Sequence, residues 1–429
     1  MAGGLLAGHR RDPPAGAGGG CRVKALELYR SVPRYLAARG LSSRLPGAAS
    51  AAVALAPVRL ADRPAPALPH PDWVRVRPLL AGICGSDLAT VGGHSSFYFS
   101  SLVSLPFTPG HEIVGELLDP VPAGPRRAGL AVGTRVVLDP VLSCRTRGLE
   151  PCAACATGSA SRCERVTLGH VSPGLQTGFC ADTGGGWSHG LVAHPSQLHA
   201  VPDDLPDERA VLVEPMACAV HVALRVALEP GASVLVVGAG AVGLLTLLAL
   251  RALTPAGRIT VVAKHPRQAA LASALGATSV VAPREAVRAV RRASGGVVLG
   301  PERGGDFLLG GVDVAFECAG SGAALSTSLR TTRAGGRVVL AGIPSAGTDL
   351  TPLWFRELEL VGAYASSGDD VDVALRLVAD DRLAAARTSF HPLHRYPDAL
   401  DEASSAGRLG LLKVGFDLRG AGGDRGDAP

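Results

Sequence analysis

The chain has 429 residues, of which 47% are hydrophobic and 18% are charged. This composition excludes a generally disordered protein, and the length allows about two or three domains. Aromatic residues make up only 4%, and the positive charge excess lies within residues 1–63, so neither base stacking nor a broad basic face for nucleic acid is expected.

Cysteine content and hydropathy indicate the compartment. Nine cysteines are too few for a disulfide scaffold, and the first 30 residues contain no apolar segment typical of a secretory signal. We therefore expect reduced thiols and a cytosolic protein. The longest apolar run, Val234 to Leu250, is interrupted by glycines and divides into a strand, a turn and a helix, so no membrane span is predicted.

The first half of the chain has the residue pattern of a β domain. Residues 1–21 are rich in Gly, Ala and Pro without any period, which predicts a mobile tail. From residue 22 to about 200, short strand-like segments at 73–76, 113–117 and 135–138 are separated by Gly and Pro. This pattern predicts an irregular, largely β domain.

The second half alternates apolar strands with alanine-rich helices. We expect strands at 234–237, 258–263, 312–316 and 337–341, and helices at 241–253 and 267–275. Alternation at this spacing predicts a parallel, doubly wound sheet over residues 201–368. A further helix and a final strand at 412–418 follow, and we assign residues 369–429 to a return into the first domain.

A glycine turn joins the first strand and helix of this second domain. The segment GAGAVG contains Gly238, Gly240, Val242 and Gly243 and runs directly into a leucine-rich helix. The first glycine permits a tight turn, the second lets the backbone approach a pyrophosphate, and the third lets the helix pack on the strand. The context predicts a dinucleotide site, with a purely structural turn as the alternative.

The end of the next strand bears on the choice of cofactor. NAD-binding folds of this type place Asp or Glu there, about 20 residues after the glycines, to bind the ribose 2′-hydroxyl. Here the strand ends in VAKHPR, which has Lys264 and Arg267 and no carboxylate. Two cations suit a 2′-phosphate, so NADP is favoured over NAD. The alternative is that both side chains only solvate the start of a helix.

Four cysteines lie close together in the sequence: Cys144, Cys152, Cys155 and Cys163. In a reduced chain, such a cluster most economically forms a closed tetrathiolate zinc site. Unrelated thiols in a surface loop are the alternative.

A second candidate metal site is spread along the chain. It combines Cys84 in GICGSD, His111 and Glu112 in PGHEIVGE, and Glu214 in LVEP. Each residue alone is unremarkable. Together, a thiolate, an imidazole and a carboxylate form a ligand set that leaves zinc one open position for a substrate.

These motifs, in this order and with the closing GLLKV segment, resemble the zinc-dependent medium-chain dehydrogenase/reductase superfamily of alcohol, sorbitol and threonine dehydrogenases. The resemblance covers residues 22 to 418. It implies a GroES-like mostly-β catalytic domain over 22–200 together with 369–429, and a Rossmann domain over 201–368.

The resemblance also implies roles for individual residues. Cys84 and His111 correspond to ligands of the catalytic zinc, and Glu214 corresponds to the third ligand or a water-bridged carboxylate. Glu112 corresponds to a carboxylate that enters or leaves the coordination sphere, and Cys218 remains an alternative ligand. By the same resemblance, the hydroxyl of Ser86 passes the alcohol proton outward.

Three features depart from the family pattern. Many relatives carry a histidine that completes the proton relay where this chain has Ala89; His94 could replace it, or the proton could leave through the ribose hydroxyl. The first two lobe cysteines enclose seven residues, 145–151, instead of two. The segment 95–106 is unusually aromatic, and we hypothesise that it lines a cleft for an apolar or bulky substrate, with core packing as the alternative.

We therefore predict a zinc enzyme that transfers a hydride between a small-molecule alcohol, aldehyde or ketone and NADP or NAD. The alternatives are an NAD-dependent polyol or amino-alcohol dehydrogenase, and a catalytically inactive nucleotide-binding regulator of the same fold. By resemblance we also expect a homo-oligomer. Neither nucleic acid nor a membrane is an expected partner.

Overall fold

The structure is a computed structural model that describes residues 21–44, 53–124, 129–343 and 347–420. The tail predicted at 1–21 therefore lies, except for Cys21, outside the described residues. Within the described ranges, no helix combines the length and the apolar character needed to cross a bilayer.

The first sheet carries the strands of the N-terminal half. Its strand order is β16-β17-β3-β4-β5-β7, and β6 pairs with β3 beside this path. These strands are β3 (Val74–Gly82), β4 (Ile113–Leu117), β5 (Arg135–Leu138), β6 (Leu191–Ala193), β7 (Leu198–Ala200), β16 (Arg387–Pro392) and β17 (Leu411–Asp417). Neighbouring strands are antiparallel except β16 and β17. The strands expected near 74, 113 and 135 are present, as predicted.

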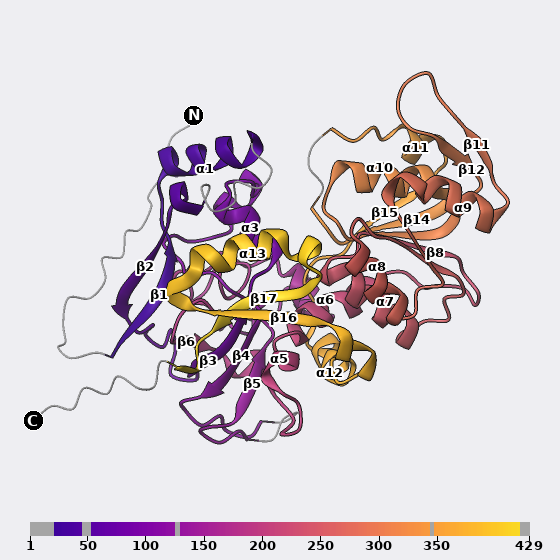
Figure 1. The fold of residues 1–429 in the computed structure, drawn as a ribbon. Coiled ribbons are helices and arrows are strands. Elements are labelled where there is room, and N and C mark those ends of the chain that lie inside the picture. The colour runs from indigo at the N-terminus through magenta and orange to yellow at the C-terminus, as the bar shows by residue number, and fades with distance from the viewer. Residues whose placement is uncertain (1–20, 45–52, 125–128, 344–346, 421–429) are drawn as a thin grey trace, which may run out of the picture.

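The C-terminal segment completes this sheet. Strand β17 pairs antiparallel with β3, with Gly415 opposite Gly82. A Cβ on Gly415 would lie 2.3 Å from the carbonyl oxygen of Ala81, so the close pairing requires glycine. Figure 1 shows the yellow elements β16, β17 and α13 (Tyr396–Leu409) among the indigo and purple strands of the N-terminal half.

The second sheet is parallel throughout and has the order β10-β9-β8-β13-β14-β15. Its strands are β8 (Val234–Val237), β9 (Ile259–Val262), β10 (Ser279–Val281), β13 (Val312–Glu317), β14 (Thr332–Leu340) and β15 (Glu359–Gly362). The order reverses between β8 and β13, which is the switch point where doubly wound sheets bind dinucleotides. The Rossmann prediction is confirmed.

Helices cover both faces of the second sheet. They are α6 (Val213–Ala223), α7 (Ala241–Leu253), α8 (Pro266–Ala274), α9 (Ala286–Ser294), α10 (Gly322–Thr331), α11 (Thr351–Phe355) and α12 (Gly368–Leu377). All four residues of β8 are buried, as are Gly243 to Leu250 of α7, because this strand and helix form the centre of the domain. This burial explains the apolar run noted in the sequence.

One apolar cluster spans both sheets. The largest buried cluster joins α6, α7 and β8 to Leu80, Val114 and Val137 of the first sheet. Val371 and Ala374 of α12 belong to the same cluster, and α12 packs on α6. Helix α6 is therefore held between the two sheets, where its first residues can reach groups from both.

The remaining elements are short or peripheral. They are β1 (Arg22–Leu28), α1 (Val32–Arg44), β2 (Val58–Pro64), α3 (Gly85–Val91), the 3-10 turn η1 (Phe97–Ser101), α4 (Ala153–Ala156), α5 (Asp207–Ala210), β11 (Val297–Leu299) and β12 (Phe307–Leu309), with further 3-10 turns at 160–162, 195–197, 283–285, 381–385 and 393–395. Of these, α3 directly follows Cys84, the first predicted zinc cysteine, and η1 comes next along the chain.

Candidate active site and metal centres

Cys84, His111 and Glu112 come together at one edge of the first sheet. Ala81 of β3 lies opposite Ile113 of β4, so the residues just after β3 and just before β4 leave the sheet at the same edge. One ligand atom from each of the three side chains lies within 4.8 Å of the others. The pairing register, rather than proximity in sequence, brings the thiol, the imidazole and the carboxylate together.

Several buried polar atoms at this edge lack partners. In the described part of the chain, Asp87 Oδ1, His111 Nδ1 and Glu112 Oε2 are buried without a hydrogen bond. Unpaired buried polar atoms cost about 1–3 kcal/mol each, so such a group is expected where a ligand belongs. A soft thiolate, an imidazole and a carboxylate are the donors that zinc takes in catalytic sites, and the residues present fit that ion.

Asp87 supports His111 from behind, a role that the sequence analysis missed. Its Oδ1 lies 3.6 Å from His111 Nδ1, and its Oδ2 accepts a hydrogen bond from the Cys84 amide at 2.9 Å. A carboxylate behind a metal-binding histidine fixes the orientation of the ring. The signal was present in GICGSD, because three residues along a helix start place Asp87 next to Cys84.

The electrostatic field at this edge favours positive charge. Burial lowers the pKa of the His111 imidazole, but Asp87 and Cys84 more than offset it, and the pKa lies well above its ordinary value of 6.5. The carboxylate of Glu214 also raises the pKa of His111. The cluster thus stabilises a cation, whether a proton or a metal ion.

Glu112 is held by a lysine from the other end of the chain. Lys413 Nζ lies 2.6 Å from Glu112 Oε1, and the two side chains are only 3% and 1% exposed. A Cβ at Gly82 would lie 1.9 Å from Glu112 Oε2, so glycine is needed where the carboxylate passes β3. The sequence analysis noted the GLLKV segment but did not assign this pairing.

Glu214 and Cys218 face the cluster from α6. Cys218 Sγ lies 3.4 Å from Glu214 Oε1, one helical turn away. Burial raises the pKa of Glu214 to about 7. The neighbouring Glu112 adds to this rise, and His111 lowers the pKa. Glu214 therefore lies near the cluster, but the group with atoms within 4.8 Å comprises Cys84, His111 and Glu112 alone among the described residues.

A tyrosine in the segment between β15 and α12 also lies near this site. Arg225 Nε donates to the Gly362 carbonyl at 2.9 Å, and His221 Nδ1 lies 3.2 Å from Asp370 Oδ2, so the segment between β15 and α12 runs along α6. Within it, burial raises the pKa of Tyr364, and Cys218 and Glu214 add to that rise. The side chain of Tyr364 as a whole is 44% exposed. Sequence analysis gave no sign of it.

The residues around Ser86 form a polar chain. Thr90 Oγ1 donates to the Ser86 carbonyl at 2.8 Å and also lies 2.8 Å from Ser95 Oγ. Ser86 is half-buried, whereas His94 is exposed. In the predicted aromatic stretch, Phe97 and Tyr98 are 67% and 78% exposed, so core packing does not account for these two rings.

Phe179, which the sequence analysis did not single out, packs against the candidate imidazole. Its ring centroid lies 5.7 Å from that of His111 and 5.3 Å from that of Phe107.

The four lobe cysteines converge despite the long first spacing. One sulfur from each of Cys144, Cys152, Cys155 and Cys163 lies within 4.8 Å of the others, and the first and last sulfurs are 3.6 Å apart. Backbone amides of Cys152 and Arg165 point at the sulfurs of Cys144 and Cys163, each at 3.4 Å. Amides of Glu164 and Cys155 lower the pKa of Cys152 to about 6, whereas burial raises the pKa of Cys155 and of Cys163. The arrangement suits thiolates around one ion.

The glycine turn has the geometry expected of a dinucleotide site. Gly238 has φ +110°, and a Cβ on Gly243 would lie 2.0 Å from the Gly238 carbonyl oxygen. Gly240 begins α7 and has nothing within 4 Å of its missing Cβ, which leaves room at the helix N-terminus. Val242 lies in the first turn of α7 and is half-buried. The turn thus presents open backbone at the switch point.

The two predicted 2′-phosphate ligands differ in the structure. Lys264 is exposed just beyond β9. Arg267 donates from its guanidinium to the Leu409 carbonyl at 2.8 Å and so contacts the C-terminal end of α13. The guanidinium of Arg267 is thus held by the protein backbone, whereas the side chain of Lys264 faces solvent.

Comparisons with known proteins agree with this architecture. The family model for the alcohol dehydrogenase GroES-like domain matches residues 70–203, and the model for zinc-binding dehydrogenase matches residues 241–380. L-idonate 5-dehydrogenase of Vitis vinifera is 31% identical over 297 residues, which is 68% of this chain and 74% of that protein. Sorbitol dehydrogenase of Bacillus subtilis is 31% identical over 291 residues, which is 67% of this chain and 72% of that protein.

A solved structure from Sinorhizobium meliloti, described as a zinc-binding dehydrogenase bound to NADP, has a TM-score of 0.64 and 25% identity and covers 92% of this chain and 99% of its own. The chain therefore belongs to the zinc-dependent medium-chain dehydrogenases, oxidoreductases that transfer a hydride between an alcohol and a nicotinamide cofactor.

Proposed function

We propose that this chain oxidises a secondary hydroxyl of a polyol and reduces the corresponding ketone, with NADP as the preferred cofactor. The observation that carries the proposal is the convergence of Cys84, His111 and Glu112 within 4.8 Å at the edge of the first sheet. Relatives named as sorbitol and L-idonate dehydrogenases support a polyol as the substrate class.

In this proposal the ligand side chains and their partners have separate tasks. Cys84 and His111 hold the zinc ion, with Glu112 or Glu214 as the third ligand. A zinc ion bound there supplies a Lewis acid for the substrate oxygen. Asp87 fixes the ring of His111 through the 3.6 Å approach to Nδ1. Cys218, outside the three-donor group, is a neighbour and not a ligand.

Other residues position the alcohol and move its proton. The Ser86 hydroxyl lies two residues after Cys84 and takes up the alcohol proton, as expected from the resemblance. Tyr364 carries a phenol whose pKa is raised, and it can donate a hydrogen bond to a second hydroxyl of the substrate. Phe179 excludes water from the face of His111 that it covers.

The substrate class can be tested with a panel of alcohols. We expect sorbitol and xylitol to have kcat/KM values at least about tenfold above those of 1-butanol and cinnamyl alcohol, because a hydrogen bond to the second hydroxyl contributes roughly 1.5 kcal/mol. Reduction of the cofactor is followed at the nicotinamide absorbance. A preference for cinnamyl alcohol would contradict the polyol proposal and support the apolar cleft. Zinc and cofactor binding without any turnover would support the inactive regulator.

Lys264 is expected to set the cofactor preference. A lysine–phosphate contact contributes about 1.5–3 kcal/mol, so Lys264→Ala should lower the preference for NADPH over NADH by about 10-fold or more. Fluorescence titration with both cofactors measures the ratio. Lys24→Ala changes an exposed lysine on β1 and serves as the matched control. An unchanged ratio in Lys264→Ala would remove the 2′-phosphate role.

We further propose that the protein forms a homo-oligomer through the open edge of the second sheet. Strand β15 ends that sheet, and Trp354 and Phe355 of the adjacent α11 are 80% and 63% exposed. Ile343, which follows β14, is also exposed, at 66%. All nine cysteines are free, which fits a reducing compartment such as the cytosol.

A further inference from the structure

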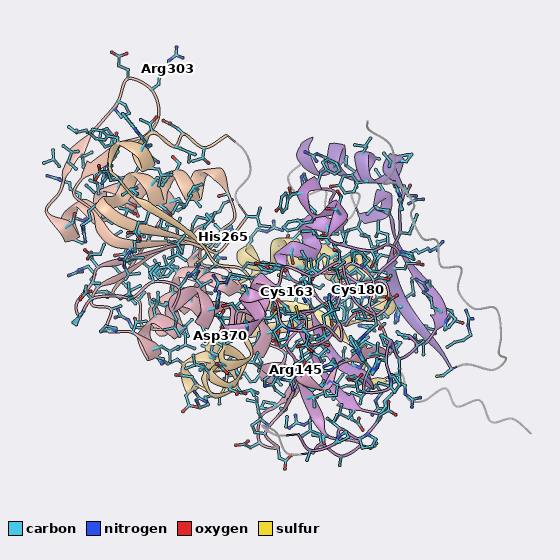
Figure 2. The ribbon with its side chains drawn as sticks, turned by 180° about the vertical axis from the view of Figure 1, so that it is seen from behind. Arg145, Cys163, Cys180, His265, Arg303 and Asp370 are labelled. Atoms are coloured by element: carbon cyan, nitrogen blue, oxygen red, sulfur yellow. The ribbon has the colours of Figure 1, made fainter. Side chains whose placement is uncertain are left out.

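The segment that lengthens the cysteine lobe carries a fully buried arginine. Arg147 lies among residues 145–151, between the first two lobe cysteines, and is 0% exposed. Arginine is almost never buried without a partner. Figure 2 shows that the body containing the labelled Cys163 and Cys180 also contains Arg145, whereas Arg303 lies at the far tip of the other body.

Backbone carbonyls satisfy the Arg147 guanidinium. Its Nε donates to Leu142 O at 3.3 Å, Nη1 donates to Leu168 O and Val171 O at 2.9 Å each, and Nη2 donates to Gly174 O at 2.7 Å. Ser172 O accepts longer bonds from both terminal nitrogens, at 3.3 Å each. The side chain thus ties the inserted segment to residues 168–174, beyond the last lobe cysteine.

The backbone of Arg147 closes on the first cysteine of the lobe. Its amide donates to Cys144 O at 3.1 Å, and its carbonyl accepts from the His170 amide at 3.3 Å. Gly169 is required at this contact, because a Cβ there would lie 2.4 Å from Arg147 O. The position of Arg147 therefore fixes the turn that presents Cys144.

Among the residues that the structure describes, Arg147 has no carboxylate at ion-pair distance, although Asp182 lies near enough to act on its charge. Burial lowers the pKa of the guanidinium, and the groups that act against this are Cys180, Cys163, Asp182 and Cys144. Two of these four are lobe cysteines. A zinc ion with four thiolates carries a net charge of about −2, which a buried cation nearby would offset.

We propose that Arg147 is the positioning cation of the thiolate zinc lobe, holding the inserted turn in place and offsetting the negative charge of the four sulfurs. The inference rests on the assignment of zinc to the cysteine cluster. It accounts for the seven-residue spacing, because the added residues contain an arginine whose amide contacts Cys144 and whose guanidinium binds the carbonyls of residues 168–174. Zinc binding and burial of the arginine then stabilise each other.

The test measures zinc release and thiol protection rather than activity. We compare the wild-type protein with Arg147→Lys, Arg147→Gln and Arg147→Met, and use Arg145→Met as a matched control at an exposed arginine of the same segment. Zinc transfer to a chromophoric chelator gives the release rate. Alkylation followed by mass spectrometry of the peptides that contain the lobe cysteines identifies the site that loses its ion.

We expect Arg147→Met to release lobe zinc about 10–100-fold faster than wild type, as is typical when a residue supporting metal ligands is lost. Arg147→Lys should retain more of the wild-type behaviour than Arg147→Gln, because only lysine keeps the charge. A purely structural arginine would give lysine and glutamine equal effects. Arg145→Met should release zinc at the wild-type rate.

Wild-type protein provides a second measurement if the variants do not fold. Removal of the lobe zinc should increase hydrogen exchange at residues 168–174, because the uncompensated guanidinium no longer holds these carbonyls. Zinc release from Arg147→Met as slow as from wild type would contradict the role of Arg147 but not the assignment of zinc to the cysteines. Hydrogen exchange unaffected by zinc removal would have the same meaning. Wild-type protein with alkylated lobe cysteines and no zinc there would contradict the metal assignment itself.

Discussion

Replacement of Cys84 by alanine is expected to abolish dehydrogenase activity and to lower the zinc content from about two ions per chain to about one. Cys84 is one of three side chains with ligand atoms within 4.8 Å. With only two protein ligands the ion is lost, and with it several kcal/mol of stabilisation of charge on the substrate oxygen. Activity should therefore fall by a factor of about 1,000 or more. Steady-state kinetics and elemental analysis of the purified protein measure both effects.

Cys218 provides the matched control for this experiment. Its thiol lies 3.4 Å from Glu214 on the same side of the site but outside the three-donor group. Cys218→Ala should keep both zinc ions. Full activity in Cys84→Ala would end the proposal of a catalytic zinc at this cluster. Loss of one ion in Cys218→Ala, with retention in Cys84→Ala, would instead make Cys218 the ligand that the sequence analysis left open.

The second large effect is expected at the buried ion pair between Lys413 and Glu112. Their charged atoms are 2.6 Å apart and both side chains are almost fully buried. Lys413→Met leaves the carboxylate buried without its partner, and breaking such a pair costs about 3–5 kcal/mol. We expect a marked decrease in the denaturation midpoint, measured by thermal or urea unfolding followed by circular dichroism.

Two further variants separate the charge of Lys413 from its packing. Lys413→Arg keeps the positive charge and should lose less stability than Lys413→Met. The double variant Lys413→Met, Glu112→Gln removes both charges and should recover a large part of the loss, because no uncompensated ion stays buried. A midpoint for Lys413→Met equal to that of wild type, or a double variant less stable than the sum of the single changes, would contradict this account.

The fold was largely predictable because its signals are local. The buried strand at 234–237, the GAGAVG turn and the leucine-rich helix adjoin in sequence, and the structure forms β8 and α7 there. Turn geometry and hydrophobic period depend on a few neighbouring residues, so one sequence suffices to recognise them. The same holds for the cysteine lobe, where 20 residues contain all four thiols.

The site was predictable only in part. The donors Cys84, His111 and Glu112 could be identified from motifs that resemble a family, but no residue pattern indicated Tyr364 or Phe179. Arg147 was noted only as part of an insertion between cysteines. In the structure its guanidinium donates hydrogen bonds to several backbone carbonyls. Arg267 was expected at a cofactor phosphate, and no residue pattern indicated its contact with the end of α13.

By itself, the sequence determined the two fold classes, the order of the motifs and the types of side chain available for zinc and a dinucleotide. Only the tertiary structure decided which of these groups meet. Glu112 and Lys413 are 301 residues apart and form a pair because β17 returns to lie beside β3. Such contacts depend on strand register and on packing between distant segments, whereas local patterns report only on the conformation of the residues that carry them.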